Sequence, residues 1–193
     1  MIKKWKKNSS KYLLENKIFK MREDSVTSPK LGTDHDVWVM EAPTWVNIIP
    51  LTPQREVVMV NQYRFGSEKA SLEIPGGMAD FGEDPKEAAI RELKEETSIK
   101  SVSLIKKIDG LLTYHLPNEL LGIIWKGKFK GQKQQWYIMR FNGEEKEINI
   151  NTKHPEFLEW RWVDPDKITE LVVEFKLHVY KKVQEEVKKI LVN

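Results

Sequence analysis

The stretch of sequence that decides the fold runs from residue 76 to residue 99 and reads GGMADFGEDPKEAAIRELKEETSI. Asp84 is a good helix N-cap residue, Pro85 suits the first helical position, and Glu87 stands at the spacing of a capping box. These signals predict a helix from about Pro85 to Thr97. The glycines before it permit sharp turns and leave backbone N–H groups available to an anion.

The predicted helix carries three carboxylates whose spacing places them on one face. Glu92, Glu95 and Glu96 stand at i, i+3 and i+4. Like charges at this spacing destabilise a helix by about 0.2–0.5 kcal/mol per pair unless a cation neutralises them. Magnesium held by carboxylates commonly binds substrate phosphates as well. The pattern therefore predicts Mg²⁺ or Mn²⁺ and phosphate chemistry, although a solvated acidic face explains the helix alone equally well.

The composition excludes several other kinds of site. The chain has no cysteine, which excludes disulfides, thiolate nucleophiles, cysteine zinc sites and iron–sulfur clusters. The four histidines have neither HxxxH nor HExxH spacing, so oxygen ligands for a hard cation remain. No apolar run approaches the roughly 18 residues of a membrane span, and no secretory h-region is present. We expect a cytoplasmic protein with no membrane partner.

The first residues of the chain are strongly basic. Residues 1–22 hold eight lysines and arginines against one glutamate, whereas the whole chain has a net charge of +3. The favoured interpretation is a lysine-rich helix on which Trp5, Leu13 and Leu14 pack; the alternative is an arm that attracts polyanions such as RNA. Because no low-complexity linker follows, we predict one domain over residues 1–193, with residues 1–43 as a basic N-terminal arm.

The rest of the chain alternates predicted strands with few helices. Runs rich in β-branched and aromatic residues predict strands at 37–40, 45–50, 55–63, 102–109, 134–141 and 157–163. From Ile168 onward, apolar residues recur every three or four positions up to Ile190, which predicts a long C-terminal helix. This order of elements indicates a layered α/β domain.

A longer pattern connects the glycines with the acidic helix. The spacing G-x5-E-x7-R-E-U-x-E-E, where U is a bulky aliphatic residue, is met by Gly77, Glu83, Arg91, Glu92, Glu95 and Glu96. Chance agreement over the whole chain is on the order of one in 10⁵. The segment resembles the Nudix box, the signature of hydrolases that cleave a nucleoside diphosphate linked to another moiety. Ser98 stands where that family has a glycine, which puts the geometry of the helix exit in question.

The resemblance implies a fold and a set of roles. The fold is an α/β/α sandwich with a mixed β-sheet, in which the box forms a loop–helix–loop. Glu92, Glu95 and Glu96 would bind the metal together with the backbone carbonyl of Gly77, and Arg91 would orient carboxylates through a bidentate pair. The implied reaction is attack of water on phosphorus, with Mg²⁺ or Mn²⁺ as cofactor. The general base is left open among the glutamates.

The two halves of the chain resemble different Nudix branches. Residues 45–97, notably VVMVNQYR at 57–64 and LEIPGG at 72–77, are similar to ADP-ribose and nucleotide-sugar pyrophosphatases. In that branch the preceding segment often pairs subunits, so residues 18–43 are a candidate dimerisation element of a homodimer. Residues 103–190 resemble bacterial RNA 5′-pyrophosphohydrolases, which are also dinucleoside polyphosphate hydrolases. The quoted matches include LTYHLP at 112–117 and PEFLEWRWV at 155–163.

The second resemblance supplies the expected substrate site. Glu156 would be a further metal ligand or the base, and the nucleotide or RNA 5′ end would be contacted by Arg64, Tyr114, Lys133, Phe175 and Lys176. Phe175 also fits the apolar stripe as a core residue, and Lys133 also reads as a solvated side chain. We expect hydrolysis of 5′-triphosphate RNA or dinucleoside polyphosphates. The alternatives are an ADP-ribose or nucleotide-sugar pyrophosphatase and a non-catalytic nucleotide-binding module.

Overall fold

The computed structural model describes residues 4–64, 68–118, 130–152 and 155–192. The chain forms two compact units, an N-terminal unit of residues Met1–Pro43 and a C-terminal unit of residues Thr44–Asn193. Each unit is described by itself. The division falls where the sequence predicts the end of the N-terminal arm, and the interpretation of 1–193 as one functional domain stays a prediction.

The N-terminal unit is an antiparallel sheet in the order β1-β2-β3. Its strands are β1 (Lys6–Glu15), β2 (Lys20–Thr27) and β3 (Asp34–Glu41). The predicted helix over residues 1–22 is therefore wrong, and Leu13 and Leu14 are exposed rather than packed. The middle of β1 contains Asn8, Ser9 and Ser10, which favour helices weakly, and pairing with β2 satisfies the backbone instead.

The C-terminal unit is built on a mixed eight-stranded sheet. Its main order is β11-β5-β4-β10-β8, and β6, β7 and β9 pair with β5, β4 and β10. Only the β4–β10 pair is parallel among the described pairs. The bounds are β4 (Trp45–Leu51), β5 (Val57–Arg64), β6 (Lys69–Glu73), β7 (Gly76–Met78), β8 (Val102–Lys107), β9 (Leu112–His115), β10 (Gly131–Phe141) and β11 (Phe157–Val163).

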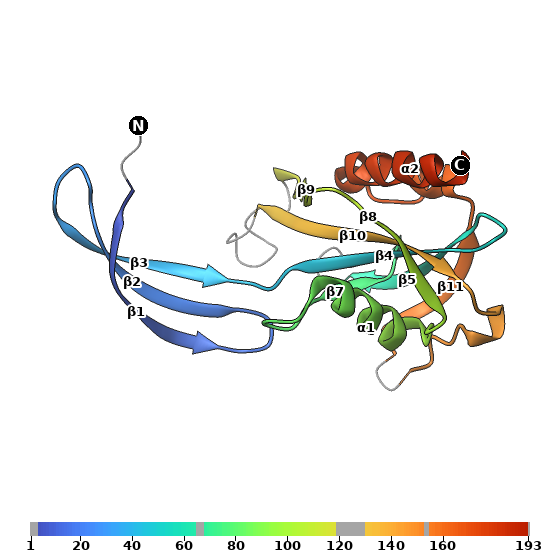
Figure 1. The fold of residues 1–193 in the computed structure, drawn as a ribbon, viewed down its shortest axis with the longest axis horizontal. Helices are drawn as coiled ribbons and strands as arrows, with labels where there is room; N and C mark the ends of the chain where they lie inside the picture. Colours follow the sequence, from blue (N-terminus) through green and yellow to red (C-terminus); the bar gives the residue numbers. More distant parts are fainter. Residues whose placement is uncertain (1–3, 65–67, 119–129, 153–154, 193) are drawn as a thin grey trace. The chain divides into compact units, whose positions relative to one another are not determined.

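Two helices cover the two faces of this sheet (Figure 1). Side chains alternate along β4, so that Ile48 packs in the cluster under α1 (Pro85–Thr97), whereas Ile49 packs in the cluster under α2 (Leu177–Val192). Burial of each such side chain contributes about 1.5–3 kcal/mol. The expected α/β/α sandwich is confirmed. In the described part of the chain, no helix has the length and apolar character needed to cross a membrane.

The box helix α1 begins and ends through its caps. The side chain of Asp84 accepts hydrogen bonds from the backbone N–H groups of Lys86 (2.9 Å) and Glu87 (3.3 Å). At the other end Ser98 adopts the left-handed conformation, with φ of 63°, and its N–H donates to Lys94 O. Ser98 Oγ also donates to Asn149 O at 3.0 Å. The exit that a glycine usually makes is thus formed by a serine with a compensating hydrogen bond.

The C-terminal helix begins later than its apolar pattern predicts. Residues from Ile168 to Lys176 form two short 3₁₀ turns, η4 (Pro165–Glu170) and η5 (Glu174–Lys176), and α2 starts only at Leu177. Val173 between the turns is extended, with φ of −63° and ψ of 142°. This break corrects the prediction of one continuous helix from 168. It also takes Phe175 and Lys176 off the helix.

Replacing Ser98 tests the cost of the helix exit. We expect Ser98→Gly to raise the free energy of unfolding by about 0.5–1 kcal/mol, because the left-handed conformation costs a residue with a Cβ roughly 1–2 kcal/mol and the lost exposed hydrogen bond offsets about half of that. The control Ser98→Ala keeps the strain, loses the hydrogen bond and should be less stable than wild type. Urea unfolding monitored by tryptophan fluorescence measures both. A glycine variant no more stable than the alanine variant would contradict this account.

Candidate functional site

The site is organised by the close approach of β7 to α1. Gly76 N donates to Glu96 Oε2 at 3.0 Å. A Cβ on Gly77 would collide with the carboxylate of Glu92, and one on Gly76 would collide with the backbone of Val46. Glycine at both positions therefore lets the strand backbone lie directly against carboxylates of the helix.

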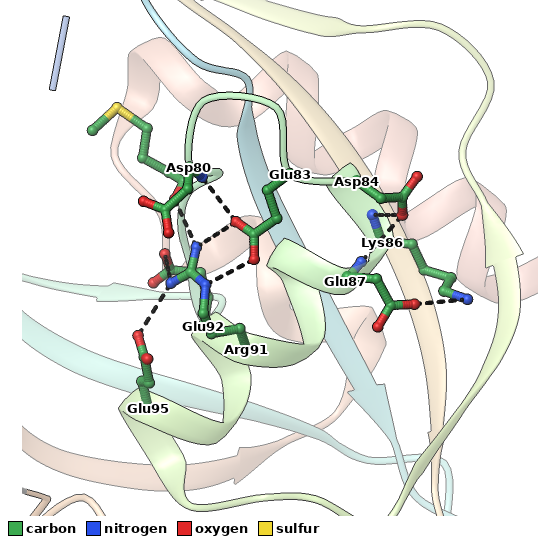
Figure 2. Close-up of polar contacts among 9 residues, drawn as sticks. Asp80, Glu83, Asp84, Lys86, Glu87, Arg91, Glu92 and Glu95 are labelled. Carbon is green, nitrogen blue, oxygen red and sulfur yellow. Dashed lines mark hydrogen bonds and ion pairs between the residues drawn. The ribbon is translucent and has the colours of Figure 1, made fainter. Parts of the chain in front are cut away.

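Arg91 is the centre of the hydrogen-bond network on α1, as Figure 2 shows. Its Nε and Nη2 donate to the two carboxylate oxygens of Glu83 at 2.9 and 2.8 Å. Its Nη1 donates to Glu92 at 2.8 Å and to Glu95 at 3.1 Å, and Nη2 also reaches Met78 O. The hydrogen bonds from Arg91 lower the pKa of Glu83 to about 2. The bidentate pair that the resemblance implies for Arg91 is thus made with Glu83.

Glu96 differs from the other box glutamates in its hydrogen bonding, because it accepts from the backbone N–H of Gly76 rather than from Arg91. Burial, with the carboxylates of Glu92 and Glu156 nearby, raises the pKa of Glu96 well above its ordinary range, and the hydrogen bond from Gly76 N opposes this only in part. Glu156 lies just before β11, is exposed, and accepts a hydrogen bond from Gln62 Nε2 at 3.0 Å. Glu92, Glu96 and Glu156 therefore form an acidic cluster whose mutual repulsion a cation would relieve.

The three box glutamates do not converge on one point in the structure. Within the described ranges, no three acidic or histidine side chains are gathered closely enough to hold a metal ion as they stand. Glu92 and Glu95 turn toward Arg91, whereas Glu96 turns toward Gly76. The candidate ligand atoms are nevertheless all oxygens, and Glu96 is a half-buried carboxylate that accepts a hydrogen bond from one neutral donor, Gly76 N. This donor set fits a hard divalent cation.

A pocket of about 970 Å³ opens beside the acidic cluster within the C-terminal unit. It brings together five residues predicted from the sequence, namely Arg64, Tyr114, Glu156, Phe175 and Lys176. The rings of Tyr114 and Phe175 lie 5.6 Å apart between centroids, and Lys176 Nζ lies 5.5 Å from the centroid of Tyr114. Burial raises the pKa of Tyr114 to about 12, so its hydroxyl stays a donor, here to Gln132 Oε1 at 3.2 Å.

The structure does not bring Lys133 into this pocket. Lys133 is exposed and lies on β10 between Gln132 and Gln134, which both line the pocket. Because successive side chains of a strand point to opposite faces, Lys133 faces away from the pocket. The prediction that it contacts substrate gains no support from this geometry.

Glu73 is a pocket residue that sequence reasoning missed. It accepts hydrogen bonds from Arg64 Nε at 2.8 Å, from Arg64 Nη2 at 2.5 Å and from Lys176 Nζ at 2.8 Å. Burial by itself would raise the pKa of Glu73, but the two cations outweigh it and lower the pKa to about 2. The available signal in the sequence is an acidic residue between two apolar ones, Leu72 and Ile74, which are both buried. Its partners depend on strand register and on η5, which the sequence leaves open.

This buried ion triad predicts a pH dependence of stability. The folded-state pKa of Glu73 lies below its ordinary value of 4.5, so its stabilising contribution is fully present above about pH 5 and is lost as the pH falls toward 2. We expect Glu73→Gln to lower the free energy of unfolding at pH 7, and the difference from wild type to shrink between pH 5 and pH 2. Urea unfolding over this range measures it, with the exposed Glu185→Gln as control. A difference independent of pH would refute the assignment.

Comparison with known proteins agrees with this geometry. Residues 42–183 match the NUDIX domain family. The chain is 56% identical over 146 residues to an RNA pyrophosphohydrolase of Pelagibacter ubique, covering 76% of this chain and 91% of the relative. It is 47% identical over 111 residues to an RNA pyrophosphohydrolase of Rhodospirillum rubrum, covering 58% of this chain and 67% of the relative.

Solved structures share the fold at low sequence identity. The crystal structure of an ADP compounds hydrolase superposes with a TM-score of 0.57 at 17% identity, covering 98% of this chain and 97% of that one. The E. coli dihydroneopterin triphosphate pyrophosphohydrolase also has a TM-score of 0.57, at 18% identity, covering 76% of this chain and 97% of that one. Nudix hydrolases generally use divalent ions such as Mg²⁺ or Mn²⁺. With the box residues from Gly77 to Glu96 at the junction of β7 and α1, the chain belongs to the Nudix family.

Proposed function

We propose that this chain is a pyrophosphohydrolase that acts on 5′-triphosphate RNA or dinucleoside polyphosphates with Mg²⁺ or Mn²⁺. The observation that carries the proposal is the pocket that places an aromatic and cationic wall beside the acidic cluster. The similarity to RNA pyrophosphohydrolases over three quarters of the chain supports the same substrate class.

The acidic end of the pocket is the proposed metal site. Glu92, Glu95 and Glu96 would hold the ion together with Gly77 O, and Glu156 would be a further ligand or the general base. Glu95 is 62% exposed in its side chain, so it can leave Arg91 at small cost. A bound divalent ion would neutralise the pyrophosphate and lower the pKa of the attacking water.

The proposed reaction is hydrolysis of one phosphoanhydride bond. The oxygen of a water forms a bond to phosphorus, and a proton of that water passes to the general base among the glutamates. The bridging P–O bond breaks, and the released phosphate group carries the bridging oxygen. The protein contributes by holding the carboxylates. Arg91 is held by its hydrogen bonds to Glu83 and Met78 O and positions Glu92 by a further hydrogen bond. The backbone N–H of Gly76 positions Glu96 in the same way.

The other end of the pocket is the proposed nucleotide site. Tyr114 and Phe175 offer aromatic surface to a base, and stacking contributes about 1–3 kcal/mol per base. Arg64 and Lys176 are both hydrogen-bonded to Glu73, which holds them at the pocket wall, where their positive charge is suited to phosphate oxygens. Lys133 has no place in this proposal because it faces away.

The proposal extends to the organisation of the chain. Residues 1–193 act as one catalytic unit in the cytoplasm, and residues 18–43 help to form a homodimer. Trp38 of β3 is 69% exposed and Ile18 is 62% exposed, which supports a surface that a second subunit covers.

An ADP-ribose or nucleotide-sugar pyrophosphatase is the second candidate activity. It is favoured by one observation, the resemblance of the segment that carries Arg64 and Glu73 to that branch. The two activities use the same acidic end and differ in what occupies the aromatic end. A non-catalytic nucleotide-binding module is the third candidate, and it would show no turnover with any substrate.

A substrate panel with a paired variant tests the proposal. With Mg²⁺ or Mn²⁺, we expect wild type to release pyrophosphate from 5′-triphosphate RNA, and Glu96→Gln to lose activity by at least about 100-fold, because even changes in residues that support metal ligands commonly cost 10–100-fold. Glu96→Gln also removes a carboxyl group whose charged form is disfavoured by desolvation and by Glu92, so the metal-free variant should be no less stable than wild type. Glu87→Gln on the first turn of α1 is the control and should keep full activity.

The same panel separates the alternatives. Release of AMP and ribose phosphate from ADP-ribose, without action on triphosphate RNA, would replace the lead activity by the second. Intact nucleotide binding without any turnover would favour the binding module. Unchanged turnover in Glu96→Gln would remove the acidic cluster from the reaction.

A truncation at the aromatic wall tests the nucleotide site. We expect Phe175→Ala to raise KM for triphosphate RNA about 5- to 100-fold with little change in kcat, because stacking binds substrate and transition state alike. Leu171→Ala, on the exposed end of the preceding 3₁₀ turn, is the matched control. Equal steady-state kinetics for the two variants would mean that Phe175 is a packing residue only.

A further inference from the structure

Asn47 is a polar residue at a position where the fold calls for an apolar one. It lies on β4 between Val46 and Ile48, on the same face of the strand as Ile49 and Leu51. Those two residues belong to the apolar cluster under α2. Asn47 is only 6% exposed, and it lines the pocket described above.

The amide of Asn47 is not satisfied by the protein. Its Nδ2 atom is buried and has no hydrogen-bond partner among the described residues, and it is the single such side-chain atom found there. A buried donor without a partner costs about 1–3 kcal/mol. A leucine, which has the same branching and number of side-chain heavy atoms, would avoid this cost, so asparagine here needs an explanation beyond folding.

The position of Asn47 indicates what would satisfy it. In the sheet Asn47 stands between Gly76 of β7 and Trp136 of β10. Gly76 carries the backbone N–H bound to Glu96. On the other side, Trp136, Gln134 and Gln132 line the pocket along β10, and Gln132 is paired with Tyr114 of β9. Asn47 therefore lies at the boundary between the acidic end and the aromatic end.

We propose that the Asn47 side-chain amide donates a hydrogen bond to a phosphate oxygen of the nucleotide at this boundary. A substrate whose base stacks at the aromatic end and whose reacting phosphorus lies at the acidic end brings its ribose and the adjoining phosphate oxygens to this boundary. Because χ2 of asparagine is a soft torsion, the amide can reorient to meet a ligand in the pocket that Asn47 lines. A neutral donor suits this place because, unlike a cation, it forms no ion pair with the carboxylates of Glu96 and Glu156.

The proposal uses the nucleotide site of the proposed function, but its test needs no hydrolysis. Binding of ADP and of adenosine to the full chain is measured by calorimetry, together with thermal unfolding of the ligand-free protein. We expect Asn47→Leu to weaken ADP binding about 5- to 30-fold, to leave adenosine binding unchanged, and to unfold at the same or a higher temperature than wild type. Asn61→Leu, on β5 and outside the pocket lining, is the control and should bind ADP as wild type does.

The outcomes separate this inference from the proposed activity. Equal ADP affinity in wild type and Asn47→Leu would overturn the inference, as would an equal loss for adenosine, which would indicate base or packing contacts instead. Failure of wild type to bind ADP would overturn it too. If wild type binds ADP with the expected dependence on Asn47 but hydrolyses no triphosphate RNA, the inference stands and the proposed activity falls.

Discussion

The contact on which the site depends is the approach of the β7 backbone to the carboxylates of α1. This approach requires glycine at two positions. A Cβ at Gly77 would displace the carboxylate of Glu92, and a Cβ at Gly76 would clash with the backbone of β4. Pairing of β7 with β4 and the hydrogen bond from Gly76 N to Glu96 then fix the helix against the sheet. The box residues therefore determine packing as well as supplying candidate ligands, because the carboxylates of Glu92 and Glu96 lie directly against the backbone of Gly77 and Gly76.

Both Arg91 and a divalent cation can relieve the repulsion among the box carboxylates. Repulsion among the box carboxylates is relieved in this structure by one guanidinium that binds Glu83, Glu92 and Glu95 together. Glu96 lies beyond its reach and keeps a strongly raised pKa because of burial and its acidic neighbours. The charge that the protein leaves uncompensated is therefore concentrated at the pocket side of the helix, where a cation would also meet the phosphates.

The sequence predicts best those features that local chemistry determines. Asp84, Pro85 and Glu87 specify the start of α1 within the segment itself, and the structure begins the helix at Pro85. The lysines and leucines of residues 1–22 predict a helix, because local sequence does not show that this segment pairs with β2 and so forms a strand. The apolar periodicity from Ile168 likewise predicts one helix past position 173. In the structure Val173 is extended, so Phe175 and Lys176 lie outside α2. Contacts that depend on strand register, such as those of Glu73 with Arg64 and Lys176, cannot be predicted from the sequence alone.

Two polar side chains in the pocket wall, Glu73 and Asn47, have opposite effects on the stability of the fold. At Glu73 a buried carboxylate is overcompensated by two cations, which lowers its pKa to about 2 and stabilises the fold. At Asn47 a buried amide is left without a partner, which costs stability. Folding alone would favour the first and remove the second. Both lie in the wall of one cavity, so the cavity, rather than the stability of the sheet, explains why a polar side chain occupies the apolar face of β4.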